Sequence, residues 1–358
     1  YLYFGGESFD AQRHSHPLGG IAITCRWRPP EILAKIALDD SQRPHVVRKT
    51  RAPREIYRHA DRNPRPVRKY TYLSPSFALC STQLGIDPPA GPIDLVSWDL
   101  GWGGAKHSAK VVANHPYRSE LRFSAFLGGL PQTLRRSIAA PKPYLQCLDR
   151  LFGASPYERM VQHEGSILVL YRIPEEDETP YVNLYLPSTA SWLEAGDGWL
   201  CADIDTTHYV GVRPIGEYGW DLIKEDDHID GWLLRITDRC AGVAVEAIEA
   251  ADMEGGFEGF VASRSKILDL DQWPVSGEVM LRTISGSSMG INWPEGSDAQ
   301  RHVDGRPIDD DCGLYDAPSI ADAELGTGRI LFEHGSERLE LDFDVDPSKP
   351  MMPMRCIG

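Results

Sequence analysis

The feature that most constrains the fold of this sequence is a succession of short β-type segments separated by glycine and proline. In "GSILVLYRI" (165–173) almost every residue is apolar, as in a strand buried on both faces, whereas "PYVNLYLP" (180–187) alternates two sets of side chains. The chain holds 33 glycines and 27 prolines, which suits many tight connections. No internal repeat is visible, which argues against a propeller or solenoid. The sequence therefore predicts a mainly β protein built as a large antiparallel β-sandwich.

Two longer stretches predict hairpins. "VRKYTYLSPSFALCSTQLG" (67–85) reads as two strands hinged at Pro75, with Tyr70 and Tyr72 on one face. "RILFEHGSERLELDFD" (329–344) reads as a hairpin whose turn places Gly335 in a left-handed conformation. Further segments are spaced like an antiparallel meander: "DGWLCADI" (197–204), "HYVGVRPI" (208–215) and "DGWLLRIT" (230–237). "GVAVEAIEAADM" (242–253) fits either a helix or a strand, and "PYLQCLDRLFG" (143–153) fits a short helix.

The N-terminal region differs from the rest. "RPPEILAKIALDD" (28–40) has two prolines at a helix start and apolar residues at helical spacing, so it predicts a short amphipathic helix. The basic, proline-bearing stretch from Arg43 to Lys69 reads as a connector. We therefore expect three regions: 1–66, the helical end and connector; 67–260, the large sandwich; and 261–358, a smaller β-sheet region.

Charge and cysteine content narrow the function classes. The net charge of −15 argues against nucleic acid as a partner, and no apolar run approaches the roughly 20 residues of a membrane span. The basic stretch either attracts an anionic substrate or is a solvated connector. None of the seven cysteines forms a CxxC pair, which argues against a structural zinc site. Their scattering suits free thiols in a reducing compartment.

The richest candidate site is "WDLGWGGAKHSAKVVANHPYRSE" (98–120). Trp98 and Trp102 offer flat apolar faces of the kind that stack on sugar rings. His107 and His115 flank a short apolar strand and could act as general bases, while Lys106, Lys110 and Arg118 could stabilise a carboxylate substrate. The alternative is that the tryptophans pack the core and the histidines cap strand ends.

Other candidates are more isolated. Arg13, His14 and His16 in "DAQRHSHPLGG" could bracket an acidic sugar or share a metal, or could form a polar loop. His163 stands at the entry of the apolar strand and is a third catalytic candidate, with a structural role as its alternative. The acidic runs at 175–178 and 309–311 read as solvated charges. No P-loop, GxGxxG or HExxH motif is present, so no cofactor is predicted; a divalent metal remains open, without assigned ligands.

The order of these segments resembles the C-terminal β region of heparinase II/III-like proteins. The resemblance is carried by "YTYLSPSFALCSTQ", "KHSAKVVANHP", "MVQHEGSILVLYRI", "DGWLCADIDTTHYVGVRP" and a final "LELDFD", and it covers about Pro30 to Asp344. These proteins have an (α/α) toroid followed by stacked antiparallel sheets. The resemblance implies that 28–38 is the last toroid helix and that Tyr1 begins inside a longer protein. It also implies a secreted or periplasmic location, in contrast to the cysteine pattern.

The resemblance further implies a polysaccharide lyase acting on an acidic, uronic acid-containing glycan. In such enzymes a Tyr or His removes the proton α to a carboxylate that another group neutralises. His107, His115 and His163 are the positions that would contribute from the sheet side, and missing toroid helices or a second chain would supply the rest. One departure is Ala109, where an aromatic residue is expected. The competing hypotheses are a non-catalytic carbohydrate-binding or scaffold module and a glycoside hydrolase.

Overall fold

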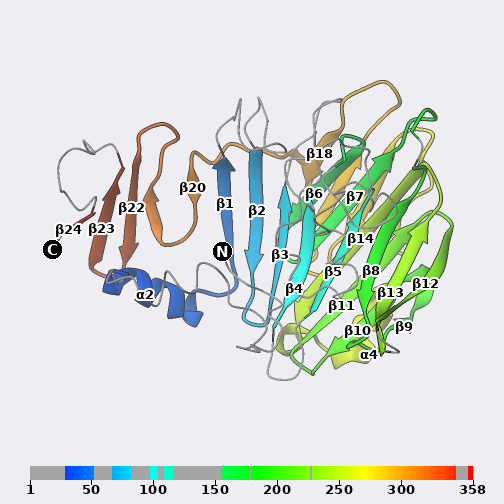
Figure 1. Ribbon diagram of the computed structural model, residues 1–358, viewed down its shortest axis with the longest axis horizontal. Coiled ribbons are helices and arrows are strands. Elements are labelled where there is room, and N and C mark those ends of the chain that lie inside the picture. The colour runs from blue at the N-terminus through cyan, green and yellow to red at the C-terminus, as the bar shows by residue number, and fades with distance from the viewer. Residues whose placement is uncertain are drawn as a thin grey trace.

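The computed structural model describes residues 29–51, 67–82, 97–103, 109–115, 155–177, 179–225, 228–343 and 354–357. Across these residues the protein is mainly β, as predicted, with three stacked antiparallel sheets and a smaller fourth sheet at one end (Figure 1). None of the helices in the described part is long and apolar enough to cross a membrane.

The largest sheet runs in the order β12-β13-β8-β5-β4-β3-β2-β1-β20. Its strands are β1 (His45–Arg51), β2 (Val67–Leu73), β3 (Phe77–Thr82), β4 (Trp98–Trp102), β5 (Ala109–Asn114), β8 (Val182–Pro187), β12 (Tyr218–Glu225), β13 (His228–Ile236) and β20 (Tyr315–Asp316). The pairing of β2 with β3 confirms the hairpin at Pro75, since Leu73 lies opposite Ala78. The basic stretch, in contrast, is not only a connector, because His45–Arg51 pairs with both β2 and β20.

The middle sheet has the order β6-β7-β14-β11-β10-β9. Its strands are β6 (Glu158–His163), β7 (Ser166–Arg172), β9 (Leu193–Glu194), β10 (Leu200–Ile204), β11 (His208–Ile215) and β14 (Cys240–Glu249). The segment 242–253, which fitted either helix or strand, therefore forms strand β14 up to Glu249 and then the short 3-10 helix η3 (Ala250–Asp252). The expected meander holds for β10 and β11 but then breaks, because the chain crosses to the large sheet for β12 and β13. Gly216, with φ +114°, lies at this crossing.

The remaining sheets belong to the C-terminal region. The five-stranded sheet comprises β15 (Leu268–Asp269), β16 (Glu278–Arg282), β17 (Ser288–Asn292), β18 (Gln300–Val303) and β19 (Arg306–Pro307). The four-stranded sheet comprises β21 (Ile320–Asp322), β22 (Arg329–His334), β23 (Glu337–Asp342) and β24 (Met354–Ile357). β22 and β23 form the predicted hairpin, and Gly335 has the expected positive φ of 61°.

The predicted N-terminal helix is present as α2 (Glu31–Leu38), with Pro30 at its N-cap. The helix lies against β22 and β23 of the four-stranded sheet (Figure 1). Ile32 is buried there, and Lys35 Nζ lies 2.5 Å from Glu337 Oε1. The toroid that the resemblance implies ahead of this helix falls outside the described residues, as does the expected helix at 143–153.

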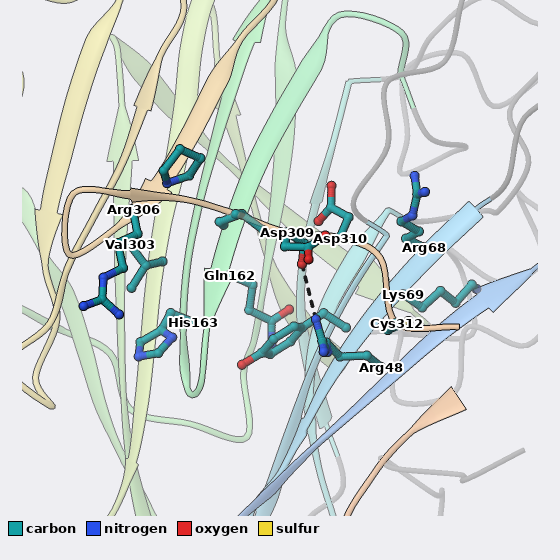
Figure 2. Close-up of a pocket in the computed structure, with 13 residues that line it drawn as sticks. Arg48, Arg68, Lys69, Gln162, His163, Val303, Arg306, Asp309, Asp310 and Cys312 are labelled. Atoms are coloured by element: carbon teal, nitrogen blue, oxygen red, sulfur yellow. Dashed lines mark hydrogen bonds between the residues drawn. The ribbon is translucent and has the colours of Figure 1, made fainter. Parts of the chain in front are cut away.

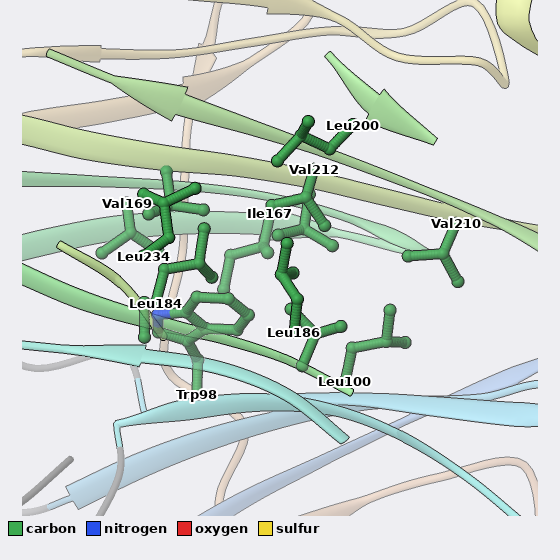
Figure 3. Close-up of a cluster of buried hydrophobic side chains, with 14 of the residues drawn as sticks. Trp98, Leu100, Ile167, Val169, Leu184, Leu186, Leu200, Val210, Val212 and Leu234 are labelled. Atoms are coloured by element: carbon green, nitrogen blue, oxygen red, sulfur yellow. The ribbon is translucent and has the colours of Figure 1, made fainter. Parts of the chain in front are cut away.

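Two hydrophobic cores separate the three stacked sheets. The first lies between the large and middle sheets and includes Leu100 and Leu184 facing Val169 and Val212 (Figure 3). The second lies between the middle sheet and the five-stranded sheet, where α4 (Gly256–Ser263) contributes the buried Phe260.

Strand β7 contributes to both cores. Ile167 and Val169 lie in the first core and Leu168 and Leu170 in the second. Successive strand residues point to opposite faces. Because both faces of the middle sheet are covered, its strand needs apolar residues at every position, which explains the continuous run in the sequence.

A buried ion pair links the middle sheet to the layer beyond it. Glu246 of β14 pairs with Arg264, which follows α4, and both side chains are buried. Glu246 Oε1 also accepts hydrogen bonds from Ser166 Oγ (2.9 Å) and from the backbone N–H of Ile284 (2.8 Å). The Arg264 guanidinium lies over the Phe260 ring, 4.9 Å from its centroid. One carboxylate thus joins two strands of the middle sheet to α4 and to the loop after β16.

Candidate functional site

A cavity of about 260 Å³ lies where the large, middle and five-stranded sheets meet. Arg48 of β1 and Arg68 and Lys69 of β2 line one side, and Gln162 and His163 line it from β6 (Figure 2). Arg306 of β19 and the segment that follows complete the lining. The stacking of the sheets therefore brings together the end of the basic stretch and one of the three predicted catalytic histidines.

The three arginines of the cavity differ in whether their charges are already balanced by a carboxylate. Arg48 donates to Asp316 Oδ2 from Nε (2.8 Å) and Nη2 (2.6 Å), so its charge is balanced. Arg68 and Arg306 form no ion pair with other described residues, and the Nε of Arg68 is buried without a hydrogen-bond partner. A buried donor without a partner costs about 1–3 kcal/mol, so Arg68 favours an anionic ligand.

His163 and Tyr70 supply groups that can exchange protons. His163 ends β6, is half-buried, and its ring makes no hydrogen bond to the described residues. Tyr70 lines the same cavity, and its Oη accepts a hydrogen bond of 3.1 Å from the backbone N–H of Glu164, next to His163. Burial raises the pKa of Tyr70, so the phenol stays protonated at neutral pH. The site thus brings an imidazole and a protonated phenol to one cavity.

Two carboxylates border the cavity. Asp310 pairs with Arg301, which corrects the expectation that this acidic run is only solvated. Asp309 is exposed, and its Oδ1 accepts from the backbone N–H of Asp311 at 2.9 Å. Because Asp310 is balanced by Arg301, it does not neutralise Arg68 or Arg306.

The structure does not support the sugar-stacking role predicted for Trp98 and Trp102. Both lie in the first core with exposures of 1% and 2%, so neither ring face is open to a ligand. The alternative interpretation, core packing, is correct for these two side chains. They lie two residues on either side of Leu100 on β4, so all three point to the inner face of the large sheet.

His115 is also a structural residue rather than a catalytic one. It is fully buried, with Nδ1 2.9 Å from Ser155 Oγ and Nε2 2.9 Å from the carbonyl oxygen of Thr179. Lys110, a neighbouring candidate cation, lies 2.5 Å from Asp99. Because its ring is buried and both ring nitrogens have partners, the structure favours a structural role for His115 over the predicted catalytic one.

The remaining predicted residues cannot be placed. Arg13, His14, His16, Lys106, His107 and Arg118 lie outside the described residues. Within the described part, no group of three or more His, Cys, Asp or Glu side chains is arranged to hold a metal ion.

Sequence reasoning missed Arg68, Tyr70 and Arg306 as site residues. The signal for the first two was present, because the basic stretch runs directly into the strand that carries Tyr70. Arg306 gave no comparable signal, since only the stacking of the five-stranded sheet brings it to the cavity.

Comparison with known proteins identifies no relative. A scan against protein-family models, a search of curated proteins and a search of solved structures all found no match to this chain. The resemblance to heparinase II/III-like proteins therefore rests on the sequence segments alone, and the geometry of the cavity has to carry the functional argument.

Proposed function

We propose that the cavity binds a carboxylate-bearing sugar of an acidic glycan and that the protein cleaves this glycan by β-elimination. The observation that carries the proposal is that Arg68 and Arg306, which have no carboxylate partner among the described residues, line one cavity together with His163 and Tyr70. The basic stretch had two interpretations, and this placement favours the one in which it attracts an anionic substrate.

Each residue has a defined role in the proposed reaction. Arg68 neutralises the uronate carboxylate, which makes the α-proton at C5 acidic enough to leave. His163 in its neutral form accepts that proton as the C5–H bond breaks. The electron pair forms the C4–C5 double bond and expels the glycosidic oxygen from C4. Tyr70 donates its phenolic proton to that oxygen, so one proton is taken from the sugar and one is returned.

A binding module is the second candidate function. A catalytic base is usually oriented by a hydrogen bond from a third group, and the His163 ring has none among the described residues. In that case the cations would hold the glycan without cleaving it.

The test is incubation of the protein with a panel of uronic acid polymers while near-ultraviolet absorbance is followed. Elimination creates a conjugated double bond that absorbs there. We expect absorbance to rise with the wild type. The rate of this rise should be about 10²–10⁴-fold lower for His163→Gln and Tyr70→Phe. His334→Gln, which alters a partly buried histidine on β22, is the matched control and should keep full activity.

The alternatives give different results. Retardation of the protein in gels that contain an acidic polymer, without absorbance, would identify a binding module. If no acidic polymer retards the protein and none gives an absorbance increase, the proposal is overturned.

A further inference from the structure

We infer that the ligand is an oligomer whose successive negative charges engage Arg68 and Arg306 separately, and that its chain continues into a second cavity. This inference rests on the proposed function, because it concerns the same site. It goes further by specifying the length and charge pattern of the ligand.

The first argument is the position of Arg68 and Arg306, the two arginines without a carboxylate partner among the described residues. Arg68 belongs to β2 of the large sheet and Arg306 to β19 of the five-stranded sheet, so they approach the cavity from different layers. Figure 2 shows them on opposite sides of Gln162 and His163. A ligand with a single carboxylate satisfies one of them. A chain with a charge on each unit can pair with both.

The other two arginines near the cavity already have carboxylate partners. Arg48 is balanced by Asp316 and Arg301 by Asp310. Within the described residues, Arg68 and Arg306 are therefore the arginines of this cavity that still lack a carboxylate partner.

The second argument is an adjoining cavity of about 610 Å³. Gln300 and His302 line it from β18, and it shares Pro307 and Ile308 with the first cavity. The Arg301–Asp310 pair lies at the boundary, since Arg301 lines the second cavity and Asp310 the first. The two cavities are thus neighbours on either side of the chain that follows Arg306.

The second cavity has mixed polar and apolar lining, and among its described residues the cation, Arg301, is paired with Asp310. His302 Nδ1 is buried without a hydrogen-bond partner. The ring is accommodated because residue 290 is glycine: a Cβ there would lie 2.7 Å from His302 Cε1. A cavity of this kind, with a paired arginine and the neutral polar groups of Gln300 and His302, suits the hydroxyl groups of a further sugar unit better than another carboxylate.

The experiment measures the affinity of galacturonic acid monomer, dimer and tetramer by calorimetry at one fixed ionic strength. We compare the wild type with Arg68→Gln, Arg306→Gln and Gln300→Ala, and use Arg282→Gln on β16, an exposed arginine that lines neither cavity, as the control. A lost charge-assisted hydrogen bond weakens binding about tenfold. We expect both arginine variants to weaken the dimer and tetramer by that factor, and at most one of them to weaken the monomer.

Gln300→Ala should weaken the tetramer and leave the monomer unchanged. Equal losses for monomer and tetramer in both arginine variants would overturn the inference, as would normal tetramer binding by Arg306→Gln. The outcome is separable from the proposed catalysis. Length-dependent binding without an ultraviolet-absorbing product supports the extended site and refutes the lyase proposal. Cleavage together with unchanged tetramer affinity in Arg306→Gln supports the lyase proposal and refutes the extended site.

Discussion

Replacing Arg264 by methionine should lower the free energy of unfolding by about 3–5 kcal/mol, because it leaves the buried carboxylate of Glu246 without its counter-charge. Glu246 keeps its hydrogen bonds from Ser166 Oγ and the Ile284 N–H, so the carboxylate remains buried but uncompensated. The methionine fills much of the space of the arginine stem against Phe260, so only a small part of the loss comes from packing.

Urea unfolding followed by tryptophan fluorescence would measure this effect. The decisive comparison is the double variant Arg264→Met with Glu246→Gln. The amide has no charge to leave unpaired and still accepts from Ser166 and Ile284. We expect the double variant to recover most of the loss and to lie within about 1–2 kcal/mol of the wild type. Arg282→Met, at an exposed position, should change stability by less than about 0.5 kcal/mol.

The reasoning would be refuted if Arg264→Met cost less than about 1 kcal/mol, or if Glu246→Gln in that background gave no recovery. The first result would mean that the carboxylate is already neutral or reaches water. The second would mean that the methionine disrupts packing instead of electrostatics.

Two further predictions concern buried titratable side chains. Burial raises the pKa of Glu158 to about 8 from 4.5, so the folded state holds a proton that the unfolded chain releases. The contribution of Glu158 to stability should therefore be largest below pH 4.5 and be lost as pH rises towards about 8, and Glu158→Gln should flatten the decline between these pH values in urea titrations. His115→Gln should cost about 1–3 kcal/mol in the same assay, because it breaks buried hydrogen bonds to Ser155 and Thr179. It should leave glycan binding unchanged, whereas a binding defect without a stability loss would restore a functional role for His115.

Local patterns in the sequence were sufficient to predict the β2–β3 and β22–β23 hairpins and the apolar strand β7. Pro75 and Gly335 marked turns because each restricts or permits a particular backbone conformation, and both hairpins are present. Strand β1 could not be recognised in the same way. It is rich in charge, and besides its pairing with β2 it pairs at Arg48 and Lys49 with β20, where Asp316, 268 residues away, balances Arg48. Long-range partners of this kind leave no trace in the local pattern.

The functional site was predictable only in part, because residues distant in the sequence decide which histidines are enclosed. His115 and His163 both stand at strand ends, and the sequence around each gives no reason to separate them. The difference comes from distant residues, because Ser155 and Thr179 enclose His115 while the five-stranded sheet leaves His163 beside a cavity. Trp98 showed the same ambiguity, since an aromatic side chain on a strand suits a core as well as a ligand platform.

The position of β7 has a consequence for biosynthesis. Its local partner is β6, but its other neighbour is β14, where Glu246 meets Ser166 across a separation of 80 residues. Until β14 leaves the ribosome, β7 lacks its second strand partner, and the face that carries Leu168 and Leu170 is uncovered because α4 and the five-stranded sheet follow later in the chain. Such an intermediate is prone to aggregate and is a natural client for chaperones that bind nascent chains. Stalled synthesis before Cys240 should therefore yield insoluble chains, while release after β14 gives the middle sheet its central pairing.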